Sequence, residues 1–77
     1  MERINVSSSQ LKSIGYDPST KTLEIEFNPM RADTTATTVY QYAEVPPSVW
    51  EGLYRATSPG SFFYKNIKGV YAYKKVE

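Results

Sequence analysis

The sequence has no cysteine and no histidine among its 77 residues. Without cysteine no disulfide can form, and without either residue type the usual ligands of zinc are missing. Disulfide-stabilised and zinc-stabilised classes of small domain are therefore excluded. The same absences remove the commonest general base and the commonest thiol nucleophile of enzymes. We expect a fold stabilised by packing alone, with no metal site and no small-molecule cofactor.

Long apolar runs are also missing. No stretch approaches the roughly 20 apolar residues that a membrane-spanning helix needs. The opening stretch, MERINVSSSQ, lacks the apolar segment of a secretory signal. The four glycines are scattered, so the sequence has no glycine-rich phosphate-binding loop. We therefore expect no membrane partner and a cytoplasmic location.

Aromatic residues, in contrast, are abundant. The chain has seven tyrosines, three phenylalanines and one tryptophan. Each buried aromatic side chain removes roughly 150–250 Å² from water. A chain of this length buries only about 60% of its unfolded surface, so large rings suit a core with few positions. We expect a single domain over residues 1–77.

Residue patterns and turn signals predict three strands. The clearest is TLEIEF, residues 22–27, in which Leu, Ile and Phe alternate with Thr and Glu. LKSIGYD, residues 11–17, precedes it across the turn DPST, and TTVYQYAEV, residues 37–45, follows it after the loop 28–36. Consecutive hairpins of this kind predict a three-stranded antiparallel meander.

Two short helices follow the strands. Pro47 suits the first turn of a helix over residues 48–56, where apolar residues recur on one face. Ser58 is a good N-cap for a second helix, which Gly69 is placed to end. Residues 70–76 predict a short final strand or an extended tail. The fold class is therefore α+β, with both helices packed on one face of the meander.

The order of these motifs resembles the KTSC domain family. The resemblance rests on SSSQLKSIGYD, TLEIEF, VYQYAEVPPSVWEGLYRA and SFFYKNIKGVY, and it spans about residues 6–73. The family is named for the C-terminal extension of some lysyl-tRNA synthetases, and it also occurs as small stand-alone bacterial and phage proteins. The resemblance implies structural roles for the motif residues Tyr40, Tyr42, Val45, Pro46, Phe63, Asn66 and Ile67. Through the synthetase, it also suggests RNA binding.

Two features depart from the family pattern. The loop 28–36 is longer than a tight hairpin, so its Met30-to-Ala36 part is specific to this chain. Lys68 stands where a basic residue, often arginine, is expected after Ile67. Lysine keeps the charge but lacks the planar fork that grips phosphate bidentately, so weaker phosphate binding is expected.

Tyr40 and Tyr42 share one face of the third predicted strand. If both rings pointed outward, they would lie beside Glu24 and Glu26. Negative charge suits a base-stacking platform for RNA poorly. We therefore favour rings that point into the core with their hydroxyls at the rim, and the outward alternative would make a stacking surface.

The C-terminal part of the chain is basic. Residues 57–77 carry four lysines and one acid. Such lysines are usually a solvated face, and the alternative is a nucleic-acid site with one stacking ring on the lysine side of the second helix. The candidate nucleic-acid-binding residues are Arg55, Tyr64, Lys65, Lys68, Lys74 and Lys75.

These observations leave two hypotheses. The first is a non-enzymatic module that contacts RNA, with tRNA as one candidate, through phosphates, with a salt slope of roughly −2 to −3 for three or four contacts. The second is a protein-interaction module, homodimerising or regulatory in a phage or bacterium, that uses the loop around Met30 or a sheet edge. Catalysis is disfavoured, since Glu24 and Glu26 read as surface residues of a strand and no catalytic residue is predicted.

Overall fold

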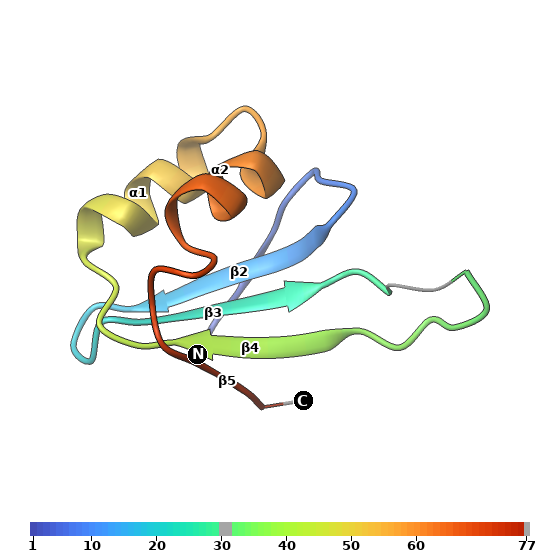
Figure 1. Cartoon of the computed structure of the whole chain (residues 1–77), viewed down its shortest axis with the longest axis horizontal. Helices are drawn as coiled ribbons and strands as arrows, with labels where there is room; N and C mark the ends of the chain where they lie inside the picture. The colour runs from blue at the N-terminus through green and yellow to red at the C-terminus, as the bar shows by residue number, and fades with distance from the viewer. Residues whose placement is uncertain (30–31, 77) are drawn as a thin grey trace.

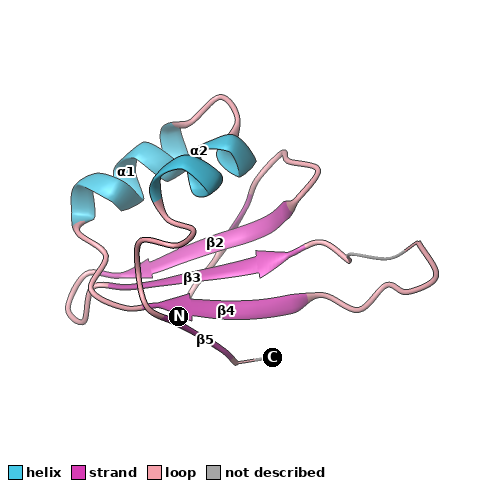
Figure 2. Ribbon diagram, in the orientation of Figure 1, coloured by secondary structure: helices cyan, strands magenta, loops and turns pink. Residues whose placement is uncertain are grey.

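The computed structural model describes residues 1–29 and 32–76, which form two layers (Figures 1 and 2). One layer is a five-stranded antiparallel sheet with the order β1-β2-β3-β4-β5. Two helices lie side by side on one face of this sheet. The elements are β1 (Ile4–Asn5), β2 (Leu11–Asp17), β3 (Thr22–Phe27), β4 (Thr38–Tyr42), α1 (Pro47–Arg55), α2 (Pro59–Asn66) and β5 (Tyr73–Lys75).

The predicted α+β class is confirmed, but the three-stranded meander is wrong. Two short strands extend the central three: β1 pairs with β2, and β5 pairs with β4, placing Tyr73 opposite Tyr42. The final segment was expected as a strand or tail and not as the fifth strand of the sheet. The two residues of β1 are too few to show alternation, and the short pattern in residues 70–76 did not reveal which strand β5 would join.

The core lies between the sheet and the helices. Leu23 and Ile25 of β3 are fully buried on the helix-facing side, as the alternation in residues 22–27 predicts, whereas Phe27 is only partly buried there. The core cluster is Leu11, Ile14, Leu23, Ile25, Tyr42, Val45, Leu53, Phe63 and Ile67. β4 ends earlier than predicted because Glu44 takes a positive φ of 57° and turns the chain toward α1.

The opposite face of the sheet, which we call the open face, carries a polar network. Arg3 Nη1 lies 2.7 Å from Glu24 Oε2, and the Gln41 amide donates to Glu24 Oε1 at 2.9 Å. Thr37 and Ser13 donate hydroxyl hydrogen bonds to Glu26 at 2.6 and 2.9 Å. These hydrogen bonds outweigh burial and lower the pKa of Glu26. The hydrogen bonds and the ion pair of the two glutamates therefore give both residues a structural role.

Both helices begin as predicted and end differently. Pro47 is the first residue of α1, and Ser58 is the N-cap of α2. α2 ends at Asn66, and Gly69 takes a φ of 78°, which glycine adopts without strain and which turns the chain toward β5. Within the described part of the chain, neither helix is long and apolar enough to cross a membrane.

Candidate functional site

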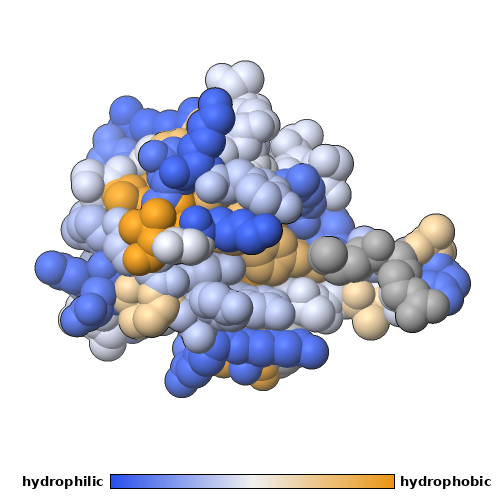
Figure 3. Space-filling view, viewed as in Figure 1, coloured by the Kyte–Doolittle hydropathy of each residue, from blue (hydrophilic) through white to orange (hydrophobic). Residues whose placement is uncertain are grey.

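An open groove of about 540 Å³ lies between α2 and the part of the sheet formed by β3, β4 and β5. Six aromatic rings line it, and we call it the aromatic groove. Its rings belong to Phe27, Tyr40, Tyr42, Phe63, Tyr64 and Tyr73. The remaining lining residues are Ser9, Gln10, Asn28, Pro29, Thr38, Lys68 and Gly69. In the space-filling view, apolar patches near the centre and left of the molecule are interrupted and surrounded by hydrophilic side chains (Figure 3).

Buried rings form the floor of the groove. Tyr42 and Phe63 are each only 5% exposed and meet edge to face, with centroids 5.6 Å apart. Phe27 packs edge-on against Phe63 at 5.3 Å and against Tyr40 at 5.7 Å. Edge-to-face geometry is the preferred contact of aromatic rings, so each ring restrains its neighbours. The floor is therefore preformed by core packing.

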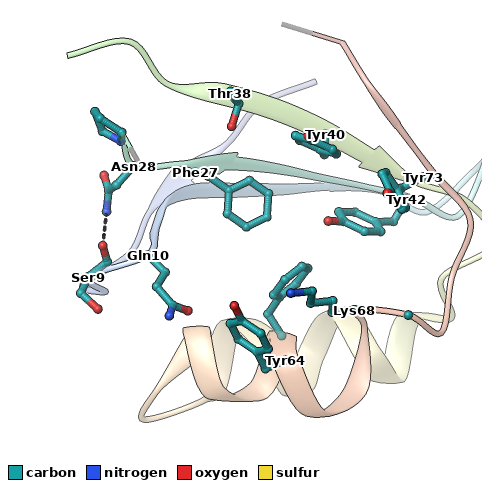
Figure 4. Close-up of a pocket in the computed structure, with 13 residues that line it drawn as sticks. Ser9, Gln10, Phe27, Asn28, Thr38, Tyr40, Tyr42, Tyr64, Lys68 and Tyr73 are labelled. Carbon is teal, nitrogen blue, oxygen red and sulfur yellow. Dashed lines mark hydrogen bonds between the residues drawn. The ribbon is translucent and has the colours of Figure 1, made fainter. Parts of the chain in front are cut away.

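Two exposed rings stand at the sides of the groove. Tyr64, from α2, is 53% exposed, and Tyr73, from β5, is 63% exposed. The Tyr73 ring lies 5.5 Å from Tyr40 and 5.8 Å from Tyr42 between centroids. The close-up shows Tyr64 below the groove and Tyr73 at its far end, beside β4 (Figure 4). A flat ligand in the groove can reach both exposed rings.

The predicted inward orientation of Tyr40 and Tyr42 is confirmed. Both rings lie on the helix-facing side, where Tyr42 belongs to the core cluster and Tyr40 packs against it. However, the sequence analysis treated a structural role and a binding role for these two tyrosines as alternatives, and the structure allows both. The helices leave this part of the inner face uncovered, so both inward rings also line the groove.

Burial raises the pKa of Tyr42 to about 12, and the neighbouring hydroxyls of Tyr40 and Tyr73 add to the shift. Ionisation would place a negative charge where water is largely excluded. The Tyr42 hydroxyl therefore stays protonated at physiological pH and remains a hydrogen-bond donor.

Among the described lining residues of the groove, Lys68 alone carries a formal charge. Its Nζ lies 4.4 Å from the centroid of the Tyr64 ring, a cation–π contact. Within the described residues, no carboxylate lines the groove and Lys68 forms no ion pair. The groove thus joins aromatic surface to one uncompensated positive charge.

The other predicted basic residues do not gather into one patch. Lys75 is the cross-strand partner of Tyr40, on the helix-facing side, whereas Lys74 pairs with Gln41 on the open face. Arg55 Nη1 lies 3.5 Å from Glu51 Oε1 on α1. The guanidinium carbon of Arg55 lies 5.8 Å from the centroid of the Tyr54 ring, in a cation–π contact. Lys65 is exposed on α2 and does not line the groove.

The remaining motif residues make contacts that hold the chain in place. Val45 is fully buried, and its carbonyl accepts a hydrogen bond from the Tyr16 hydroxyl. Pro46 is the N-cap of α1, and the Asn66 amide donates to the Phe62 carbonyl. Ile67 is fully buried beside Phe63 in the core cluster. These contacts agree with the structural roles that the resemblance implies.

Sequence reasoning missed several groove residues. Phe27 was treated only as core, and Gln10 and Asn28 were not singled out at all. The alternation of residues 22–27 reveals which face of a strand is apolar, but not whether a helix covers it. The predicted contact at Met30 lies outside the described residues.

The KTSC domain family matches residues 7–76. The chain belongs to this family. A crystal structure of a KTSC domain protein from Yersinia pestis superposes with a TM-score of 0.84 at 39% identity, and the match covers 99% of this chain and 97% of that one. The resemblance inferred from residues 6–73 is therefore confirmed.

Two further relatives place the KTSC domain in different settings. A protein from Stutzerimonas stutzeri is 38% identical over 68 residues, which are 88% of this chain and 86% of that protein. A lysine–tRNA ligase from Nostoc is 37% identical over 68 residues, again 88% of this chain. This region is only 11% of the ligase, so the chain corresponds to a small part of that enzyme.

Proposed function

We propose that this KTSC domain is an RNA-binding module that holds unpaired nucleotides in the aromatic groove. The observation that carries the proposal is the combination of six rings and the Lys68 ammonium group in one groove, with no carboxylate among the lining residues that the structure describes. Proteins that bind single-stranded RNA stack unpaired bases on aromatic side chains and hold phosphates with basic ones. The groove offers both chemistries.

The kinship with a lysine–tRNA ligase supports RNA as the partner class. The ligase acts on tRNA, as its name states, and it contains a region 37% identical to this chain. Unpaired loops and ends are the parts of an RNA whose bases can leave the stack. A loop or the end of a tRNA is therefore the form of RNA that fits the proposal best.

In this proposal, the lysines on the groove side of the molecule bind the RNA phosphates. Lys68 lines the groove just beyond the end of α2, Lys75 lies opposite Tyr40, and Lys65 is exposed on α2. Lysine acts as a point charge without a bidentate fork, so each contact is modest and sensitive to salt. We place Lys74 and Arg55 outside this RNA-binding surface.

The proposal assigns no catalysis to the groove. Its lining has no carboxylate, and the chain has no histidine or cysteine. Glu24 and Glu26 lie on the open face, and the lowered pKa of Glu26 makes it a weak base. A binding module fits these residues better than an enzyme.

Neighbouring lysines on β5 provide a matched test. Lys75→Glu and Lys74→Glu make the same charge change one residue apart, on opposite faces of the sheet. Binding of a fluorescently labelled single-stranded RNA would be followed by anisotropy at low salt. We expect Lys75→Glu to weaken binding clearly and Lys74→Glu to weaken it much less. No RNA binding by the unmodified protein, or equal losses in the two variants, would contradict the proposal.

The edges of the sheet give the protein-interaction alternative less support. β1 has two residues and β5 has three, two of them lysines. Short edges with lysine side chains discourage pairing with a further strand. Sedimentation in solution checks this point: a stable dimer whose formation prevents RNA binding would favour self-association.

A further inference from the structure

The two ends of the aromatic groove differ in chemistry. Gln10 and Asn28 lie at one end and Tyr73 lies at the other, and the Lys68 side chain reaches toward Tyr64, so that its ammonium group lies over that ring (Figure 4). The groove therefore presents neutral amides at one end and an ammonium group farther along it, among aromatic rings. A ligand that complements this order has a polar uncharged edge, a flat apolar body and an anionic group.

The amide end is held in place by the chain around it. Asn28 Nδ2 donates to the carbonyls of Ser8 and Ser9 at 3.2 Å each. The Gln10 side chain lies so close to Gly60 that a Cβ atom there would stand 2.8 Å from Gln10 Oε1. Side-chain amides are the groups that proteins use to read the edges of bases.

We propose that the groove binds one unpaired nucleotide, with its base edge toward Gln10 and Asn28 and its phosphate at Lys68. The inference rests on the proposed RNA-binding function and deepens it by assigning the orientation of the bound nucleotide and the number of nucleotides that the groove holds. The groove volume of about 540 Å³ lies within the roughly 300–1,000 Å³ typical of small-ligand sites. It suits a single nucleotide.

Charge complementarity favours a nucleotide over a peptide. Proline-rich peptides also dock in grooves lined by aromatic rings. Such peptides carry no obligatory negative charge, and they leave Lys68 without an anionic partner. The phosphate of a nucleotide replaces the cation–π contact of Lys68 with a stronger charge-assisted hydrogen bond.

The direct experiment titrates the isotopically labelled full chain with small ligands and follows backbone amides by nuclear magnetic resonance. The probes are adenosine 5′-monophosphate, adenosine and inorganic phosphate. We expect saturable shifts at Tyr64, Lys68 and Tyr73, with the nucleotide bound more tightly than adenosine and phosphate bound least. Residues of the open face, such as Gln41, should not shift.

Three variants separate the parts of the site. Lys68→Gln should weaken the nucleotide about tenfold, as expected for loss of one charge-assisted hydrogen bond, without weakening adenosine. Tyr64→Leu should weaken both ligands about tenfold through lost stacking. Lys74→Gln, on the open face and outside the groove lining, is the control and should change neither affinity.

The outcomes distinguish this inference from the broader proposal. Single-stranded RNA that binds while the mononucleotide does not would overturn the one-nucleotide site and leave RNA binding standing. Mononucleotide binding without RNA binding would support the site and overturn the RNA-binding function. Equal binding of phosphate and nucleotide, or preferential binding of a proline-rich peptide at the same residues, would overturn the nucleotide assignment.

Discussion

At the scale of single residues, Tyr42 belongs to the core and to the groove at once. Its ring is 5% exposed and packs on Phe63, yet it also lines the groove beside Tyr73. A change at this position therefore affects stability as well as binding. The exposed rings of Tyr64 and Tyr73 are better positions at which to test binding alone.

The raised pKa of Tyr42, about 12, predicts a loss of stability in alkali. The unfolded chain releases this proton near pH 10, before the folded protein does. The contribution of Tyr42 is therefore fully present below about pH 10 and declines by about 1.4 kcal/mol per pH unit toward pH 12. In urea unfolding over this range, Tyr42→Phe should show a shallower decline in the free energy of unfolding.

An exposed hydroxyl provides the control for that measurement. Tyr54 is 41% exposed on α1. The free energy of unfolding of the Tyr54→Phe variant should decline with pH as that of the unmodified protein does. If Tyr42→Phe shows the same decline as Tyr54→Phe, burial of the Tyr42 hydroxyl is not the cause of the alkaline loss.

Glu26 gives the corresponding prediction in acid. Hydrogen bonds from Thr37 and Ser13 hold its pKa below the ordinary value, so its contribution to stability is present above about pH 4 and is lost as the pH falls through the folded-state pKa. Thr37→Val removes one donor and should raise that pKa. It should also lower the free energy of unfolding at neutral pH by about 1 kcal/mol.

Carbon resonances of the Glu26 carboxyl group measure this pKa directly. Thr34→Val is a suitable control, because Thr34 is exposed and its hydroxyl accepts only from the nearby Ala36 amide. A Glu26 titration that is identical in Thr37→Val and the unmodified protein would show that the Thr37 hydrogen bond does not set the pKa.

At the scale of elements, the two helices pack through Gly52. A Cβ atom at this position would stand 2.6 Å from Cζ of Phe62, so glycine lets the Phe62 ring lie against α1. Alanine would favour the helix by about 1 kcal/mol, but it would push this ring out of place. We expect Gly52→Ala to lower the melting temperature.

The sign of that effect should depend on Phe62. In a Phe62→Leu background the shorter side chain leaves space, so the same Gly52→Ala change should stabilise the protein by up to about 1 kcal/mol. Thermal unfolding of the four proteins in this cycle measures the coupling. A stabilising Gly52→Ala change in both backgrounds would show that the ring contact does not matter.

The elements also show what the sequence could predict. Residues 22–27 were placed correctly because polar and apolar residues alternate there, and residues 11–17 were placed correctly because the turn signal DPST follows that strand. The starts of α1 and α2 followed from proline and serine chemistry. β1 and the pairing of β5 could not be predicted, because such short strands are selected by the edges they join rather than by their own pattern.

At the scale of the whole molecule, the fold divides the basic residues that the sequence places together. Lys74 and Lys75 are adjacent in the chain but face opposite sides of the sheet, and Arg55 is paired with Glu51. The groove lies where the helices leave part of the inner face of the sheet uncovered. How far the helices cover the sheet depends on the packing of the two layers, which no local sequence pattern encodes. The site was therefore predicted only in part.

This division changes the expected salt dependence of RNA binding. Two or three lysines on the groove side can neutralise two or three phosphates, so log K should fall with log salt at a slope of roughly −1.5 to −2 for a single strand. The slope follows from anisotropy titrations at several salt concentrations, with Lys74→Glu as the control that should leave it nearly unchanged. A slope near −3 or steeper would indicate that the open face also contacts RNA.

One side of the groove belongs to a strand of three residues at the edge of the sheet. β5 pairs only with β4, and its Tyr73 ring is largely exposed. Short edge elements open far more often than the core does. A bound ligand that rests on Tyr73 would hold β5 closed, so hydrogen exchange of the β5 amides would report occupancy of the groove. β5 would then act as a flap over the groove, and the time that it stays paired with β4 would depend on whether a ligand is bound.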